Sequence, residues 1–370
     1  MKQFRVSLFL LLISQLSFSC AFISSENSAS HFRSEKLFIV ERERESVAVI
    51  GVDAKISHIA DLGNLNHATL KFKKGFGYVL ARDGYLAKID TLSEKLVKKV
   101  KIGKSGIGIT FTENQVVIVN YDPNSVVILD LELNVQKVIE TNSRNVGIKV
   151  WKNYLVFSLM DKNEIWVLDS LQEFKRIKKF ENIGNLPFDA LIHENVYVVG
   201  FFNEPSVGLL DLNLMTYTKI AMKDAGEQLI YKVPHFGQWG VVDQQVFVPM
   251  VSSNKLLVLD LKSLKAVGEV QLIGRAVFAA VSPDKKILAV NFSGDQEDYI
   301  SLVDTSTKKV MSTFKAGKRI MHLRFSRDAR SLYATSYFEN KLYVFDAKTT
   351  KEKATIPVST PSGIFIEEEK

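Results

Sequence analysis

Basic and histidine side chains recur in the short polar connections of this chain, between runs of apolar residues. They are His67, Arg82, Arg144, His235, Arg275, Lys318 and Arg319, and Tyr121 occupies the same kind of connection. Guanidinium groups bind carboxylates in a bidentate manner, and a neutral imidazole can ligate iron. If the fold gathers these side chains, they suit a flat, apolar ligand that carries several carboxylates and a metal.

Each of these residues also has a purely structural interpretation. Arg82 precedes an Asp-Gly pair, a strong hairpin-turn signal, and could be a solvated turn residue. His67 opens an apolar run and could be a hydrogen-bonded core histidine. His235 lies in the longest of the connections, which is rich in aromatic residues and suggests a flap. His322 lies within the run "IMHLRF" and is predicted to pack in the core. Whether each residue binds a ligand or has a structural role depends on where the fold places it.

An apolar run that ends on aspartate recurs eight times along the chain. Its aspartates, spaced 37 to 49 residues apart, are Asp53, Asp90, Asp130, Asp169, Asp211, Asp260, Asp304 and Asp346. A period of about 40 residues with short apolar stretches is typical of propeller blades with four strands each. No long stretch shows helical periodicity. We expect each aspartate to end the third strand of its blade and to accept hydrogen bonds from turn amides, as a turn cap and not as a catalyst.

The strands can be placed within a repeat. In the third repeat they are expected at residues 107–111, 115–120, 125–130 and 135–140. The first repeat supplies only three strands, whereas "TPSGIFIEEE" (360–369) resembles an innermost strand with no second strand after it. We therefore predict an all-β, eight-bladed propeller over residues 36–370, with the first blade closed by the C-terminal strand. This closure leaves no long sheet edge unpaired.

The blade assignment also sorts residues by face. In a propeller, the connections between blades and the turns between the second and third strands lie on one face, around the mouth of the channel. All of the candidate residues fall in one of these two kinds of segment. We therefore expect two histidines and a set of cations to converge at one mouth. His58 and His193 fall on an outer strand and on a turn of the opposite face, so neither is a candidate.

The N-terminal residues are typical of an export signal. A basic start is followed by "VSLFLLLISQLSF", an apolar run too short to span a membrane. Cys20, the only cysteine, follows Ser19 as at a bacterial lipoprotein cleavage site, although the usual leucine at −3 stands at −4. We expect residues 1–19 to be a signal, Cys20 to be lipidated and residues 20–35 to form a tether, which predicts a periplasmic, membrane-anchored protein. The alternative is an ordinary signal peptide cut nearby.

Charge and motifs exclude several classes of function. The net charge is +7, and loss of the two basic residues of the signal lowers it to +5, which favours anionic ligands. No Lys/Arg run with interleaved aromatic residues points to nucleic acid. The sequence contains no GxGxxG opening a helix, no P-loop and no Cys/His metal set. The absence of CxxCH excludes a covalently attached c-type haem.

Several segments in combination resemble the NirF family of haem d1 biosynthesis proteins, over nearly the whole mature chain. They are "LNHATLKF", "VLARDGYLAKID", "VIVNYDP", "VFSLMDKNEIWVLD", "YKVPHFGQW", "GRAVFAAVSPDKKILAVNF", "AGKRIMHLRFSRDA" and "TPSGIFI". The wider family includes the d1 domain of the cytochrome-type dissimilatory nitrite reductase. Its members are eight-bladed propellers that hold the tetrapyrrole at the mouth. The resemblance implies haem d1 or its dihydro precursor as the ligand.

The resemblance also implies roles for single residues. His67 matches the histidine that ligates the d1 iron on the proximal side, and His235 matches one of two distal histidines of the reductase. The second distal histidine is missing, because Arg275 and Phe278 occupy that stretch. Since the c-type haem motif is also absent, the chain is expected neither to accept electrons nor to reduce nitrite by itself.

Three hypotheses follow. The first is a tetrapyrrole-binding maturation factor, enzyme or carrier, that holds a late haem d1 precursor and works with nitrite reductase or other maturation proteins. The second is a non-enzymatic envelope propeller that binds a protein through its faces. The third is an oxidoreductase that acts on the bound ring. Convergence of histidines and arginines favours the first over the second, whereas the first and third stay open because the ligand would supply the redox chemistry.

Overall fold

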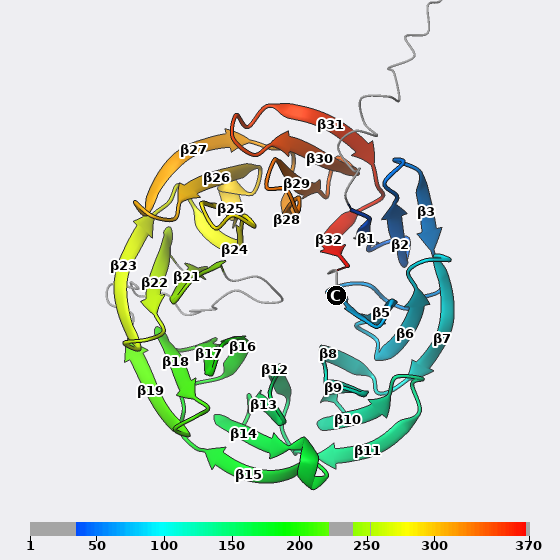
Figure 1. The fold of residues 1–370 in the computed structure, drawn as a ribbon, viewed down its shortest axis with the longest axis vertical. Coiled ribbons are helices and arrows are strands. Elements are labelled where there is room, and N and C mark those ends of the chain that lie inside the picture. The colour runs from blue at the N-terminus through cyan, green and yellow to red at the C-terminus, as the bar shows by residue number, and fades with distance from the viewer. Residues whose placement is uncertain (1–34, 222–239, 252, 368–370) are drawn as a thin grey trace, which may run out of the picture.

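The structure is a computed structural model that describes residues 35–221, 240–251 and 253–367. Within these ranges, thirty-two strands form eight four-stranded antiparallel sheets arranged in a ring (Figure 1). The predicted all-β, eight-bladed propeller is therefore confirmed. The only helical segments in the same ranges are two single 3-10 turns, η1 (Ser170–Gln172) and η2 (Gly294–Gln296). None of the described segments forms a helix of the length and apolarity needed to cross a bilayer.

We name the four strands of a blade A to D from the centre of the ring outward. In this order, blade 1 is β32 (Pro361–Ile366), β1 (Leu37–Glu41), β2 (Ser46–Ile50) and β3 (Ile56–Ile59). Blade 2 is β4 (Thr69–Lys73), β5 (Phe76–Leu80), β6 (Tyr85–Asp90) and β7 (Lys95–Lys101). Blade 3 is β8 (Ser105–Phe111), β9 (Gln115–Asp122), β10 (Ser125–Asp130) and β11 (Val135–Glu140). Blade 4 is β12 (Asn145–Trp151), β13 (Tyr154–Leu159), β14 (Glu164–Asp169) and β15 (Lys175–Phe180).

The second half of the ring repeats this plan. Blade 5 is β16 (Pro187–His193), β17 (Val196–Phe201), β18 (Ser206–Asp211) and β19 (Thr216–Ala221). Blade 6 is β20 (Gly240–Val242), β21 (Gln245–Met250), β22 (Lys255–Asp260) and β23 (Lys265–Gln271). Blade 7 is β24 (Arg275–Val281), β25 (Ile287–Ser293), β26 (Tyr299–Asp304) and β27 (Lys309–Lys315). Blade 8 is β28 (Ile320–Phe325), β29 (Ser331–Ser336), β30 (Lys341–Asp346) and β31 (Glu352–Pro357).

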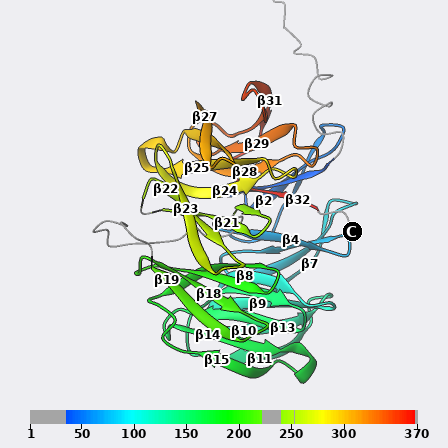
Figure 2. The same ribbon diagram turned by 60° about the vertical axis from the view of Figure 1, so that its left-hand side comes forward.

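Burial explains why strands B and C are apolar on both sides. Eight clusters of buried side chains lie one between each pair of neighbouring blades, so every blade is covered on both faces. Figure 2 shows the blades following one another around the ring, with the outer strands β19 and β23 brought forward. Strand β10 is accordingly buried along almost its whole length, whereas the outer strand β11 is mostly exposed.

The eight repeated aspartates are turn caps, as predicted. Seven of them end strand C of their blade, and Asp53 follows β2 by three residues. In each case a carboxylate oxygen accepts a hydrogen bond from a backbone N–H two to four residues later. At Asp304 the amides of Thr307 and Ser306 and their hydroxyls all donate to one oxygen, which lowers the pKa of this carboxyl to about 2.

The C-terminal strand closes the ring, also as predicted. Strand β32 pairs antiparallel with β1, with Phe38 opposite Phe365 and Ile39 opposite Ile364. A fully buried carboxylate reinforces the closure: Glu41 accepts from Ser46 Oγ at 2.6 Å and from the backbone N–H of Ser359 at 3.1 Å. His58 Nδ1 lies 2.8 Å from the same carboxylate. One side chain thus joins strands B, C and D of blade 1 to the segment that leads into its strand A.

Glu41→Ala should lower the free energy of unfolding by about 3 kcal/mol, because it leaves several buried donors without an acceptor. Urea unfolding followed by circular dichroism measures the change. Glu45→Ala, at an exposed position of the same turn, is the control and should stay within about 0.5 kcal/mol of wild type. A loss of similar size in both variants would contradict a special role for Glu41.

Asp304→Asn should flatten the acid limb of the stability profile. A carboxyl with a lowered pKa stabilises the fold above its ordinary pKa of 3.8, and this contribution is lost as the pH falls towards about 2. Asparagine does not titrate, so the urea midpoint of the variant should depend less on pH in this window than that of wild type. The exposed Asp295→Asn should keep the wild-type slope, and identical slopes for all three proteins would contradict the prediction.

Candidate functional site

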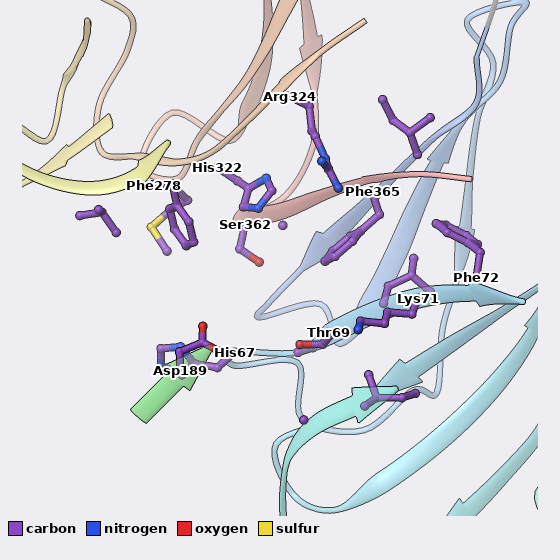
Figure 3. Close-up of a pocket in the computed structure, with 18 of the residues that line it drawn as sticks. His67, Thr69, Lys71, Phe72, Asp189, Phe278, His322, Arg324, Ser362 and Phe365 are labelled. Atoms are coloured by element: carbon purple, nitrogen blue, oxygen red, sulfur yellow. The ribbon is translucent and has the colours of Figure 1, made fainter. Parts of the chain in front are cut away.

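A cavity of about 1700 Å³ lies at the centre of the ring, where the A strands face one another (Figure 3). Strands β4, β8, β12, β16, β24, β28 and β32 all contribute residues to its wall. Typical small-molecule sites occupy roughly 300–1000 Å³. The cavity is therefore large enough for a bulky ligand.

The wall combines apolar surface with positive charge. Six phenylalanines line it: Phe72, Phe111, Phe188, Phe278, Phe292 and Phe365. The same wall includes nine Lys or Arg residues and four Asp or Glu residues, an excess of five positive charges when histidines are neutral. Such a surface suits a flat, apolar molecule that carries several anionic groups.

Four of the cations belong to A strands: Lys71 and Lys73 on β4, Lys149 on β12 and Arg324 on β28. Figure 3 shows Lys71 and Arg324 projecting from these strands into the cavity. The neighbours of Arg324, Leu323 and Phe325, are buried between blades, so the alternation of the strand turns Arg324 to the opposite side. Sequence reasoning missed all four cations. The available signal was a charged residue within an innermost strand that is otherwise apolar.

Bulges in the A strands aim further polar side chains at the cavity. The pairing of strands A and B shifts register between Val146 and Lys149 in blade 4, and between Ile320 and His322 in blade 8. In blade 5 the shift spans Asp189, which also lines the cavity and is drawn in Figure 3. A bulge adds an unpaired residue and re-aims the side chains beside it. The position of a bulge is not visible in the apolar pattern.

Lys149 is the cation with the most perturbed environment. Burial lowers its pKa below the ordinary 10.5, and the nearby Asp189 acts in the opposite direction. Its Nζ donates to the carbonyl of Ile148 at 3.2 Å, and it forms no ion pair with any described residue. A buried ammonium without a bound counter-ion is unfavourable, so this position favours an anionic ligand.

His322 is both a packing residue, as predicted, and part of the cavity wall. Its ring stacks on Phe365 at 6.1 Å and lies 5.2 Å from Phe278, centroid to centroid. Burial, assisted by Arg324, lowers its pKa to about 3, so the ring is neutral at physiological pH. Nδ1 accepts a hydrogen bond from the backbone N–H of Ile364 at 3.3 Å, which places the proton on Nε2. His322 therefore offers a donor, not a metal ligand, at Nε2.

His67 and Arg319, two of the predicted site residues, also line the cavity. Both have left-handed backbone conformations, with φ of 60° and 57°, and both precede an A strand, β4 and β28 respectively. Figure 3 shows His67 at the cavity wall. The same backbone conformation recurs at many turns of the described chain, so it places these two residues in tight turns before their strands.

Three other predicted residues form a separate cluster on the rim, outside the cavity wall. Arg82 and Arg144 lie over the ring of Tyr121, at 5.5 and 5.9 Å from its centroid. Burial raises the pKa of Tyr121 to about 12 although both arginines oppose the shift. Arg144 forms an ion pair with Asp161, with Nη2 2.6 Å from Oδ1, which lowers the pKa of that carboxyl. The guanidinium of Arg144 thus already has a carboxylate partner.

The remaining predicted residues are farther from the cavity or outside the described ranges. Arg275 begins β24 and is exposed, and Lys318 is exposed next to Arg319. Neither belongs to the cavity wall. His235 and Cys20 lie outside the residues that the structure describes.

No described group of three or more His, Cys, Asp or Glu side chains could hold a bare metal ion. An iron carried by a tetrapyrrole has different needs, since the macrocycle supplies four ligands and the protein supplies an axial one. Two histidines line the cavity wall, and because His322 is held as the tautomer protonated on Nε2, His67 is the candidate ligand for such an iron. The donor set therefore fits a tetrapyrrole iron better than a bare ion.

Comparisons with known proteins agree with this chemistry. Residues 33–370 match the family described as the cytochrome D1 heme domain. The protein NirF of Pseudomonas aeruginosa is 32% identical over 352 residues, covering 88% of this chain and 90% of that protein. NirF of Stutzerimonas stutzeri is 30% identical over the same shares of both chains.

A solved structure shows the same fold. It is the dihydro-heme d1 dehydrogenase NirN in complex with DHE, with a TM-score of 0.77 and 20% identity, covering 90% of this chain and 75% of the other. The family match spans nearly the whole chain, and the curated relatives match over nearly their full length. The chain therefore belongs to the cytochrome D1 heme domain family, as a NirF-like member.

Proposed function

We propose that this protein binds a late precursor of haem d1, such as its dihydro form, or haem d1 itself, at the mouth of the propeller. In doing so it takes part in the biosynthesis of the haem d1 of dissimilatory nitrite reductase. The observation that carries the proposal is the central cavity, which joins six phenylalanines to five excess positive charges and has His67 on its wall. A carboxylated tetrapyrrole has the matching properties of a flat apolar face, an anionic periphery and an iron.

The residues fit the ligand in three separate respects. His67 would supply the axial imidazole to the iron. Lys71, Lys149 and Arg324 would face the carboxylate substituents of the tetrapyrrole, which enter the cavity together with its apolar ring. Phe365, stacked on His322, and Phe278, tilted beside it, would cover part of the ring surface. When bound, the iron tetrapyrrole itself supplies any redox chemistry.

The alternative of a purely structural envelope propeller does not account for the interior charges. A scaffold that binds partners through its outer faces gains nothing from a lysine whose burial disfavours its charged form. An anionic occupant would stabilise both Lys149 and the net positive wall. The tetrapyrrole proposal therefore explains features that the alternative leaves unused.

The rim and the N-terminus have secondary roles in the proposal. Arg82, Tyr121, Arg144, Arg275 and Lys318 would lie around the mouth, where the cations would raise the local concentration of an anionic ligand. His235 would act on the distal side of the ring. Export to the periplasm and lipidation of Cys20 would hold the protein near the membrane, where nitrite reductase or another maturation protein would receive the ligand.

His67→Ala should abolish the shift in the absorption spectrum that appears when wild-type protein is titrated with haem d1 or its dihydro precursor. The expected reason is loss of the axial imidazole. His193→Ala, which removes a histidine at the far end of β16, should retain the wild-type spectrum. An unchanged ligand spectrum with micromolar wild-type protein would refute tetrapyrrole binding.

The affinity for the ligand should decline as the pH rises, at pH values where an ordinary lysine is still fully charged. Lys149 has a lowered pKa, so it loses its proton earlier than other lysines and then no longer attracts a carboxylate. Fluorescence or absorption titrations at a series of pH values would measure the effect. Lys149→Met should bind more weakly at neutral pH and show a flatter profile, whereas the exposed Lys152→Met should follow wild type. Identical profiles for wild type and Lys149→Met would contradict this role.

A further inference from the structure

Two guanidinium groups from different blades meet over one aromatic ring at the mouth. Arg42 lies in the turn between β1 and β2, and Arg319 lies directly before β28. Their Cζ atoms lie 5.8 and 5.4 Å from the centroid of the Tyr337 ring, in the turn that follows β29. Arg319 also lies over Phe338, at 5.3 Å. Both arginines line the central cavity.

The pair has no counter-ion among the residues that the structure describes. Neither guanidinium forms an ion pair with a described carboxylate. Arg42 Nε is buried and makes no hydrogen bond. Burial lowers the pKa of Arg42, and the positive charge of Arg319 adds to this effect although Tyr337 opposes it. Two like charges held together with an unsatisfied buried donor are unfavourable unless an anion joins them.

The backbone holds both arginines in place before any ligand arrives. The amide of Arg42 donates to the carbonyl of Thr360 at 3.2 Å, across the closure of blade 1. The amide of Arg319 donates to the carboxylate of Asp298 at 3.0 Å, and its carbonyl accepts from the amide of Tyr337 at 3.1 Å. Such preorganisation reduces the entropy cost of binding.

We propose that Arg42 and Arg319 form a two-guanidinium site that binds one carboxylate of the macrocycle, where blades 8 and 1 meet. The inference rests on the proposed function and adds to it the class of substituent and its location. Guanidinium groups are planar donors that match a carboxylate, and both line the cavity in which the ligand would lie. His67 lies in the adjacent blade 2, so iron ligation and carboxylate binding together would fix the rotation of the ring in the mouth.

The test compares haem d1 with its fully methyl-esterified form, which keeps the iron and the ring but lacks the negative charges. Arg42→Leu and Arg319→Leu should each weaken binding of the free acid roughly 10- to 100-fold. The double variant should lose less than the product of the two single losses, because both arginines hold the same group. The ester should bind to wild type and to the variants with equal affinity.

Arg44→Leu is the matched control, since Arg44 lies in the same turn, is exposed and is not part of the cavity wall. It should bind the free acid as wild type does. If the leucine variants fail to fold by circular dichroism, Arg42→Lys and Arg319→Lys take their place and should also weaken binding of the free acid, because lysine lacks the planar fork.

The outcomes separate the two levels of the proposal. Wild-type protein that binds neither form of haem d1 and not the dihydro precursor either would overturn the proposed function together with the carboxylate site. Wild-type protein that binds the free acid, with single variants within twofold of it, would overturn the carboxylate site alone. Equal losses for acid and ester would likewise overturn it, because they would indicate a structural effect of the substitutions.

Discussion

Burial of both faces of every blade is the constraint on which the whole structure depends. A sheet such as β8 to β11 presents apolar side chains on its two sides, so it is stable only between two neighbours. Eight clusters satisfy this requirement around the ring, and the one that contains Leu37 and Ile364 joins the last blade to the first. Closure by β32 is thus a necessity, because an open ring would expose two apolar faces and an unpaired sheet edge.

The central cavity follows from the same constraint. Side chains alternate along each A strand. One set packs between neighbouring blades, and the other set therefore points towards the axis of the ring. Leu323 and Phe325 pack between blades, whereas Arg324 between them lines the cavity. Charges placed there lie at low dielectric, where they attract an anion more strongly than they would at the surface. Burial accordingly lowers the pKa of Lys149, which disfavours its charged form.

The mouth uses a different kind of position. His67 and Arg319 lie one or two residues before A strands in left-handed conformation, and Arg42 lies in a turn between strands B and C. These loops can vary without disturbing the clusters between blades, so they can carry specificity while the strands carry stability. The ring thus separates an interior that attracts carboxylates from a rim that would select the orientation of a ligand.

The sequence by itself determined the architecture. Eight apolar runs that end on aspartate, from Asp53 to Asp346, predict the number of blades. The segment "TPSGIF" near the C-terminus predicts the strand that closes the first blade. Both predictions are possible because strand periodicity and turn chemistry are local properties of the sequence. It also placed His67 and Arg319 at the mouth, since the face of a loop follows from its position in the blade. Only the tertiary structure decided which cations enter the cavity. Lys149 and His322 face it because of bulges, Arg144 is held by Asp161, and Arg42 meets Arg319 across the closure. Pairings between distant segments and shifts of register depend on the assembled ring, and no local pattern encodes them.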